Sequence, residues 1–129
     1  MGFDVYGVNP ENESGEYFRN NVWWWRPLWM FVCGTCEDIL SEKDVEAGHF
    51  NDGHKISKTK CNKIVKRLQE IMDDGTIAEY AARYEKDRKE QSEKSNKDED
   101  RLLTSYPFSK ENVQEFIKFL KNSGGMKIW

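Results

Sequence analysis

A cluster of tryptophans constrains the fold more than any other feature of this 129-residue chain. Four of its five tryptophans lie in the segment 23–29, together with Arg26 and Pro27. A tryptophan buries roughly 150–250 Å² and still needs a partner for its indole N–H, so a fold places such a cluster in its core or in the wall of an aromatic binding site. The sequence alone leaves both uses open.

Pro27 predicts how the chain runs through this cluster. A proline disfavours helical geometry at the residue before it and suits the first position of a helix. We therefore expect an extended chain through Arg26 and a helix from Pro27 onward. One face of that helix carries apolar residues at helical spacing, namely Leu28, Trp29, Val32 and Cys36.

An extended chain would split the cluster between two sides. Trp24 and Arg26 would share one side and Trp23 and Trp25 the other. A tryptophan beside an arginine offers a stacking plane and a bidentate donor, which suits a base, an anion or a partner's aromatic ring. We expect a ligand-binding surface at Trp24 and Arg26, with Arg19 and Asn21 adding polar groups just upstream. The alternative is that all four indoles lie in the core.

The rest of the chain predicts helices between terminal strands. Apolar residues recur at helical spacing after the capping residues Ser57, Thr76 and Ser109, and 42–47 suits a short turn of helix. Segments 3–8, 16–20 and 126–129 suit strands, and the two ends of the chain are expected to pair. The predicted fold is mainly α (α+β): about four helices packed on an aromatic cluster, with a small antiparallel sheet formed by the N- and C-terminal strands.

Length and charge set further limits. A chain of 129 residues suits a single domain spanning 1–129. Segment 85–105 is rich in charges of both signs, and we expect a mobile helix end or linker there. The net charge of −3 disfavours generic nucleic-acid binding. The sequence contains no apolar run long enough to span a membrane. We expect a cytoplasmic protein without a signal peptide.

Several blocks of the sequence resemble a group of small, uncharacterised proteins encoded by bacteria and their phages. The shared blocks are GFDVYG at 2–7, GEYFRNNVWWWRPLW at 15–29, GHxNDG at 48–53, YPFSxxNV at 106–113 and a GGxxI ending at 124–128. The resemblance spans nearly the whole chain except the region between Tyr84 and Tyr106. It implies an intact single domain of microbial or phage origin and no particular chemistry.

The spacing of Cys33, Cys36, His49 and His54 matches a two-cysteine, two-histidine zinc site. Glycines and an Asn-Asp pair surround the histidines and disfavour the helix that a zinc finger needs there. We expect the protein to bind no cofactor. We also expect the three cysteines to be thiols, because an odd number of cysteines in a reducing compartment does not form a disulfide framework. A zinc-stabilised interaction module stays open as an alternative.

The loop at 49–54 is a second candidate site. His49, Asn51, Asp52 and His54 supply imidazole, carboxamide and carboxylate groups within six residues. A His49–Asp52 pair would suit a hydrolase-like enzyme, and a tight turn satisfied by its own side chains is the simpler interpretation. We expect a non-catalytic binding protein that uses the Trp/Arg surface and this loop to hold a small anionic or nucleotide-like ligand or a host protein.

Overall fold

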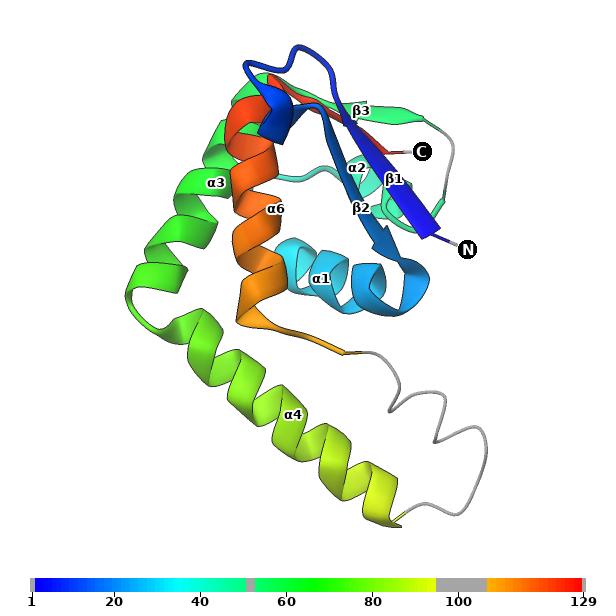
Figure 1. The fold of residues 1–129 in the computed structure, drawn as a ribbon, viewed down its shortest axis with the longest axis vertical. Helices are drawn as coiled ribbons and strands as arrows, with labels where there is room; N and C mark the ends of the chain where they lie inside the picture. Colours follow the sequence, from blue (N-terminus) through cyan, green and yellow to red (C-terminus); the bar gives the residue numbers. More distant parts are fainter. Residues whose placement is uncertain (1, 51–52, 95–106, 129) are drawn as a thin grey trace.

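Four short strands form one antiparallel sheet in which the two ends of the chain meet. The structure is a computed structural model that describes residues 2–50, 53–94 and 107–128. The strands are β1 (Gly2–Gly7), β2 (Tyr17–Asn21), β3 (His54–Ile56) and β4 (Met126–Ile128), in the order β2-β1-β4-β3 (Figure 1). The predicted pairing of the two ends is confirmed, whereas β3 is an element that the sequence does not predict.

Five helices accompany the sheet in the described chain, and they confirm a mainly helical fold. They are α1 (Val22–Thr35), α2 (Glu42–Ala47), α3 (Lys58–Asp73), α4 (Thr76–Lys94) and α6 (Lys110–Ser123), with a 3-10 turn η1 (Glu13–Gly15) between β1 and β2. Ser57 and Ser109 cap α3 and α6 as predicted, because each side chain accepts a backbone N–H of the first turn. Gly124 ends α6 in the left-handed conformation, with a φ of 67°.

Helix α4 differs from the prediction at its start. Thr76 is its first residue rather than its cap, and the Thr76 N–H donates to Asp74 Oδ1 at 2.8 Å. The helix runs through Lys94 into the charged segment. The rest of the predicted linker, 95–105, lies outside the described residues.

Helix α1 begins five residues before the predicted start, so the extended chain through Arg26 is wrong. Asn21 caps the helix, since its side-chain oxygen accepts the Trp24 N–H at 3.1 Å. Pro27 lies inside the helix. The early start places apolar side chains at helical spacing on one buried face, namely Trp25, Leu28, Trp29 and Val32. Burial of this face outweighs the local preference of a pre-proline residue for extended geometry.

Two tryptophans of α1 form the centre of the core. Trp25 and Trp29 are both 0% exposed, and their rings stack with centroids 5.4 Å apart. Phe3 of β1 stacks on the other face of Trp25 at 5.5 Å, and Phe116 of α6 meets it edge-on at 5.9 Å. The pair therefore joins α1 to the sheet and to the last helix.

Both buried indoles have hydrogen-bond acceptors. The Trp25 Nε1–H donates to the Gly48 carbonyl at 2.7 Å and the Trp29 Nε1–H donates to the Val45 carbonyl at 2.9 Å. Both carbonyls lie at the end of α2, where a short helix leaves its last acceptors without intrahelical donors. The tryptophans thus fix α2 against α1.

A second aromatic group attaches α4. Phe31 of α1 contacts Tyr80 at 4.7 Å and Phe108 at 5.2 Å, and Tyr84 contacts Phe108 at 5.7 Å between ring centroids. The predicted stripe of α4 therefore packs on the core, while the far end of the helix projects away from the sheet (Figure 1).

The close approach of α2 to the tryptophans predicts the effect of two glycine substitutions. A Cβ added at Gly48 would lie 1.9 Å from Nε1 of Trp29, whereas a Cβ at Gly34 of α1 would meet nothing within 4 Å. We expect Gly48→Ala to lower the free energy of unfolding by about 1–3 kcal/mol through overpacking. Gly34→Ala is expected to raise it by about 0.5–1 kcal/mol, because alanine is the better helix former. Urea unfolding measures both, and equal effects of the two variants would contradict this packing.

Candidate functional site

The structure does not bring Trp24 and Arg26 together as predicted. The two residues lie on a helix, where positions two apart do not share a face. Trp24 is half-buried and Arg26 is exposed. The predicted recognition pair needed the alternation of an extended chain, so its geometry is wrong.

Arg19 and Asn21 have structural partners. Arg19 lies across from Asp4 in the β1–β2 register, with Arg19 Nε 3.5 Å from Asp4 Oδ1. Asn21 caps α1, and its neighbour Asn20 exchanges two side-chain hydrogen bonds with Asn112 of α6. The polar run 19–21 therefore ties the edge strand to two helices.

The predicted loop at 49–54 is divided by the structure. His49 is exposed in the turn after α2, and His54 begins β3. Asn51 and Asp52 lie outside the described residues. The hydrolase-like pairing of His49 with Asp52 stays a prediction.

His54 instead contacts a buried carboxylate that the sequence analysis missed. His54 Nε2 lies 2.8 Å from Asp44 Oδ1, and Lys60 Nζ lies 2.5 Å from Asp44 Oδ2. The Asp44 side chain is 5% exposed, and it also accepts the backbone N–H of Ser41 while the Ser41 hydroxyl accepts the N–H of Asp44. This reciprocal capping pattern appears in the sequence as Ser-x-x-Asp at 41–44, and this motif could have identified Asp44 from the sequence.

The groups around Asp44 keep its carboxyl group ionised. Burial alone would raise the pKa of this carboxyl, but hydrogen bonds from Lys60, His54 and Ser41 outweigh burial and lower the pKa to about 2. The cluster joins α2, β3 and α3 through one ionised side chain.

A hollow of about 190 Å³ lies beside the Asp44 cluster and is lined by Lys43, Glu46, Ala47, Phe50 and His54. Ligand pockets usually exceed about 300 Å³, so this hollow is smaller than a typical ligand pocket.

The cysteines are free thiols, of which Cys36 and Cys61 are buried and Cys33 is half-buried. Burial raises the pKa of Cys33 and of Cys61 to about 12, and it also raises that of Cys36. Across the described residues, no group of three or more cysteine, histidine or acidic side chains is arranged to hold a metal ion. Cys33, Cys36, His49 and His54 are all described, so the structure does not bring together the residues of the alternative zinc site.

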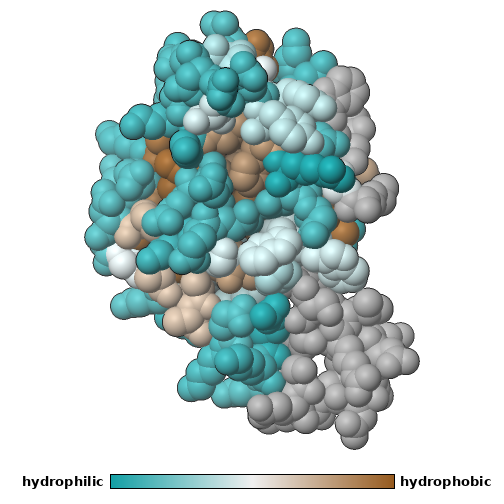
Figure 2. Space-filling view, in the orientation of Figure 1, coloured by the Kyte–Doolittle hydropathy of each residue, from teal (hydrophilic) through white to brown (hydrophobic). Residues whose placement is uncertain are grey.

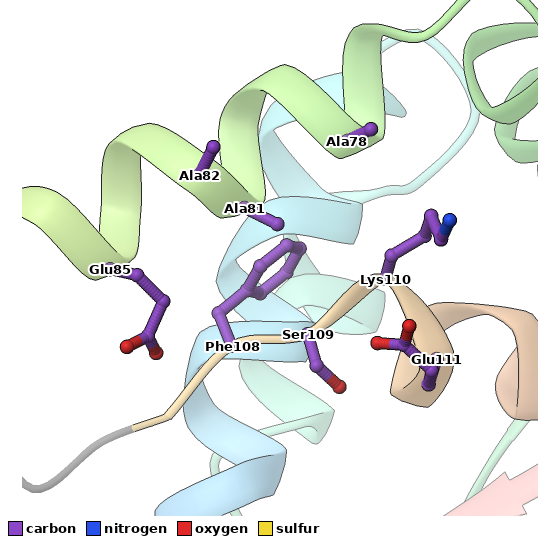
Figure 3. Close-up of a pocket in the computed structure, with 8 residues that line it drawn as sticks. All are labelled: Ala78, Ala81, Ala82, Glu85, Phe108, Ser109, Lys110 and Glu111. Carbon is purple, nitrogen blue, oxygen red and sulfur yellow. The ribbon is translucent and has the colours of Figure 1, made fainter.

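Two larger hollows are open and shallow in character. One, of about 330 Å³, lies between the alanine face of α4 and residues 108–111, with Phe108 pointing toward Ala81 (Figure 3). Another of about 330 Å³ lies over α3 and is lined by Asp38, Ile39, Lys63, Lys66, Arg67 and Glu70. Figure 2 shows that hydrophilic side chains cover most of the viewed face, with hydrophobic ones visible between them.

The outer face of the sheet gathers a row of aromatic and basic side chains. Successive side chains of a strand point to opposite faces of the sheet, and Phe3, Val5 and Phe18 point to the inner face, where they are buried. The strand register then aligns one outward residue from each strand, in the order Tyr17, Tyr6, Lys127 and Lys55. This set is called the outer row below.

The two tyrosines of the outer row form an exposed ring pair. Tyr6 is 42% exposed and Tyr17 is 45% exposed, and their ring centroids lie 5.1 Å apart at 52°. The Tyr17 hydroxyl donates to Asp4, which also pairs with Arg19. These contacts hold the Tyr17 ring in place while leaving ring surface in contact with solvent. The sequence predicted β1, β2 and β4 but neither β3 nor which residues would align across the strands.

No helix of the described residues is both long and apolar enough to cross a membrane. Comparisons with protein-family models, with curated proteins and with solved structures found no match for this chain.

The lowered pKa of Asp44 predicts a pH dependence of stability. Because the folded pKa of about 2 lies below the ordinary value of 3.8, the contribution is complete above that value and is lost as the pH falls toward 2. We expect Asp44→Asn to lower the free energy of unfolding by about 2 kcal/mol at neutral pH, and the difference from wild type to shrink in acid. Asp38→Asn is the control, since Asp38 pairs with Arg67 in solvent. A difference that does not change with pH would contradict the pKa.

The raised thiol pKa values predict slow reaction of the folded protein with a thiol reagent. At about pH 8 the buried thiols stay protonated, and the thiolate is the reactive form. We expect Cys33, Cys36 and Cys61 to react together only when urea unfolds the chain. Rapid labelling of one thiol in the native protein would show that its pKa is not raised.

Proposed function

We propose that this protein is a non-catalytic binding protein that holds an anionic, nucleotide-like ligand on the outer row of its sheet. The observation that carries the proposal is the exposed Tyr6–Tyr17 ring pair beside Lys127 and Lys55. Tyrosine rings stack on nucleobases, and lysines on the same face attract phosphate. The outer row takes the place of the predicted Trp24–Arg26 pair, while the kind of ligand stays as the sequence suggested.

The chemistry of the buried groups supports binding rather than catalysis. A general acid or base at neutral pH works best with a pKa near 7. The pKa of Asp44 is about 2 and those of Cys33 and Cys61 are about 12, so none of these three groups is tuned for proton transfer. The carboxylate of Asp44 is already engaged by Lys60, His54 and Ser41.

The shape of the surface supports the same conclusion. Enzymes usually enclose their substrates in pockets that exclude water, whereas the hollows of the described residues are open to solvent. An exposed ring pair on a rigid sheet needs no enclosure to stack a planar base. Tyr6 lies on a central strand of the sheet, between β2 and β4, so its backbone is held on both sides.

Alanine substitution of the tyrosines tests the proposal. We expect Tyr6→Ala and Tyr17→Ala each to weaken binding of a mononucleotide such as UMP, by about 1–3 kcal/mol or roughly 5- to 150-fold, through loss of stacking. Tyr6→Phe is expected to keep the affinity, since the ring remains. NMR chemical-shift titration measures both affinity and location.

Phe50→Ala is the matched control, because Phe50 is 62% exposed and lies outside the outer row. Shift changes confined to residues away from β1, β2 and β4 would remove the basis for this site. Equal losses in Tyr6→Ala and Phe50→Ala would do the same.

A further inference from the structure

We infer that the ligand of the outer row is a single-stranded nucleic acid whose phosphates continue from Lys127 and Lys55 onto the exposed lysines of α3. This inference rests on the proposed function and extends it from one nucleotide to a strand. The exposed lysines of α3 are Lys58, Lys63 and Lys66.

The charge of the chain is unevenly distributed. Its net charge is −3, yet the segment 54–67 contains six lysines and arginines and no acidic residue. This segment comprises β3 and most of α3. The overall acidity opposes generic binding to duplex DNA, but a local basic strip still attracts a polyanion that lies along it.

Partners within the fold account for only two of these six cations. Lys60 pairs with the buried Asp44 and Arg67 pairs with Asp38. For the other four, Lys55, Lys58, Lys63 and Lys66, the described residues provide no ion pair. These four side chains are exposed, and of the four Lys63 also lies near Asp38, whose carboxylate its charge helps to stabilise.

The outer row leads into α3 along the chain. Neighbouring strands lie about 4.8 Å apart, so the outer row spans about 14 Å from Tyr17 to Lys55. Lys55 is three residues before Lys58, the first residue of α3. Lys58 and Lys66 are eight residues apart, which is about 12 Å along a helix. Asp38 and Glu70 line the same hollow as Lys63 and Lys66, so acidic residues border this end of the strip.

The aromatic end of this strip selects a single strand over other polyanions. Only unpaired bases can leave their own stack and lie against Tyr6 and Tyr17. An acidic protein surface could pair with the lysines, but it would offer no planar bases to the exposed rings. The combination of exposed rings and a basic track is the arrangement that single-strand-binding surfaces share.

A length and salt series tests the inference. We expect a fluorescently labelled oligouridine or oligothymidine of roughly 12 nucleotides to bind at least tenfold more tightly than UMP, because the added phosphates reach α3. The logarithm of affinity should fall with the logarithm of salt concentration with a slope of about −2 to −3, as for three or four phosphate contacts on a single strand. Fluorescence anisotropy measures the oligonucleotides and NMR titration measures UMP.

The decisive variant is Lys58→Ala, Lys63→Ala and Lys66→Ala combined. We expect it to bind the oligonucleotide at least tenfold more weakly with a shallower salt slope, and to bind UMP as wild type does. The control combines Lys86→Ala, Lys89→Ala and Lys118→Ala, which removes the same charge from exposed positions of α4 and α6. Its oligonucleotide affinity should stay within about twofold of wild type.

Four results would overturn the inference. An oligonucleotide that binds no more tightly than UMP would leave the proposed function intact and remove the track. Equal losses in the two triple variants would show a general charge effect. Poly-glutamate that competes as well as unlabelled oligonucleotide would show an acidic-protein surface instead. Absence of binding by both UMP and the oligonucleotide would remove the proposed function as well.

Discussion

The stacked pair of Trp25 and Trp29 is the interaction on which the rest of the structure depends. The two rings lie four residues apart on α1, and each donates its indole N–H to a carbonyl at the end of α2. Phe3 extends the stack into the sheet and Phe116 closes it from α6. Aromatic pairs contribute about 0.5–1.5 kcal/mol beyond the burial of their area. The same two residues therefore connect three helices and a strand.

This use of the tryptophans determines where binding can occur. Trp25 and Trp29 are fully buried in the core, so these two rings cannot also line a pocket. The inner face of the sheet is likewise committed to packing, through Phe3, Val5 and Phe18. The outer face is built from the alternate residues of the same strands, and a core-driven register sets the tyrosines and lysines of the outer row side by side. The proposed binding surface is in this sense a consequence of the core.

The local signals in the sequence predicted most of the elements correctly. Ser57, Ser109 and Gly124 mark helix ends through short-range hydrogen bonds or backbone conformation, which need no knowledge of the fold. The start of α1 was wrong because two local rules conflict there. Pro27 disfavours helix before it, Asn21 favours a helix after it, and long-range burial of Trp25 decides between them.

The candidate sites were harder to predict, because each depends on contacts between distant residues. Trp24 and Arg26 would share a face only in a strand, where every second side chain lies on the same side, whereas the chain is helical there. Asp44 could be recognised as part of a capping box, but its contacts with His54 and Lys60 depend on how α2 packs against β3 and α3. The outer row requires the register of four strands from opposite ends of the chain.

Hydrogen exchange at the indole N–H groups tests the central role of the tryptophan pair most directly. NMR resolves the Nε1–H signals of individual tryptophans in the native protein. If Trp25 and Trp29 are the buried, bonded centre of the core, their Nε1–H groups exchange only through global unfolding, with the free energy that urea unfolding gives. Exchange of the Trp25 Nε1–H at the rate of an exposed indole would contradict the account.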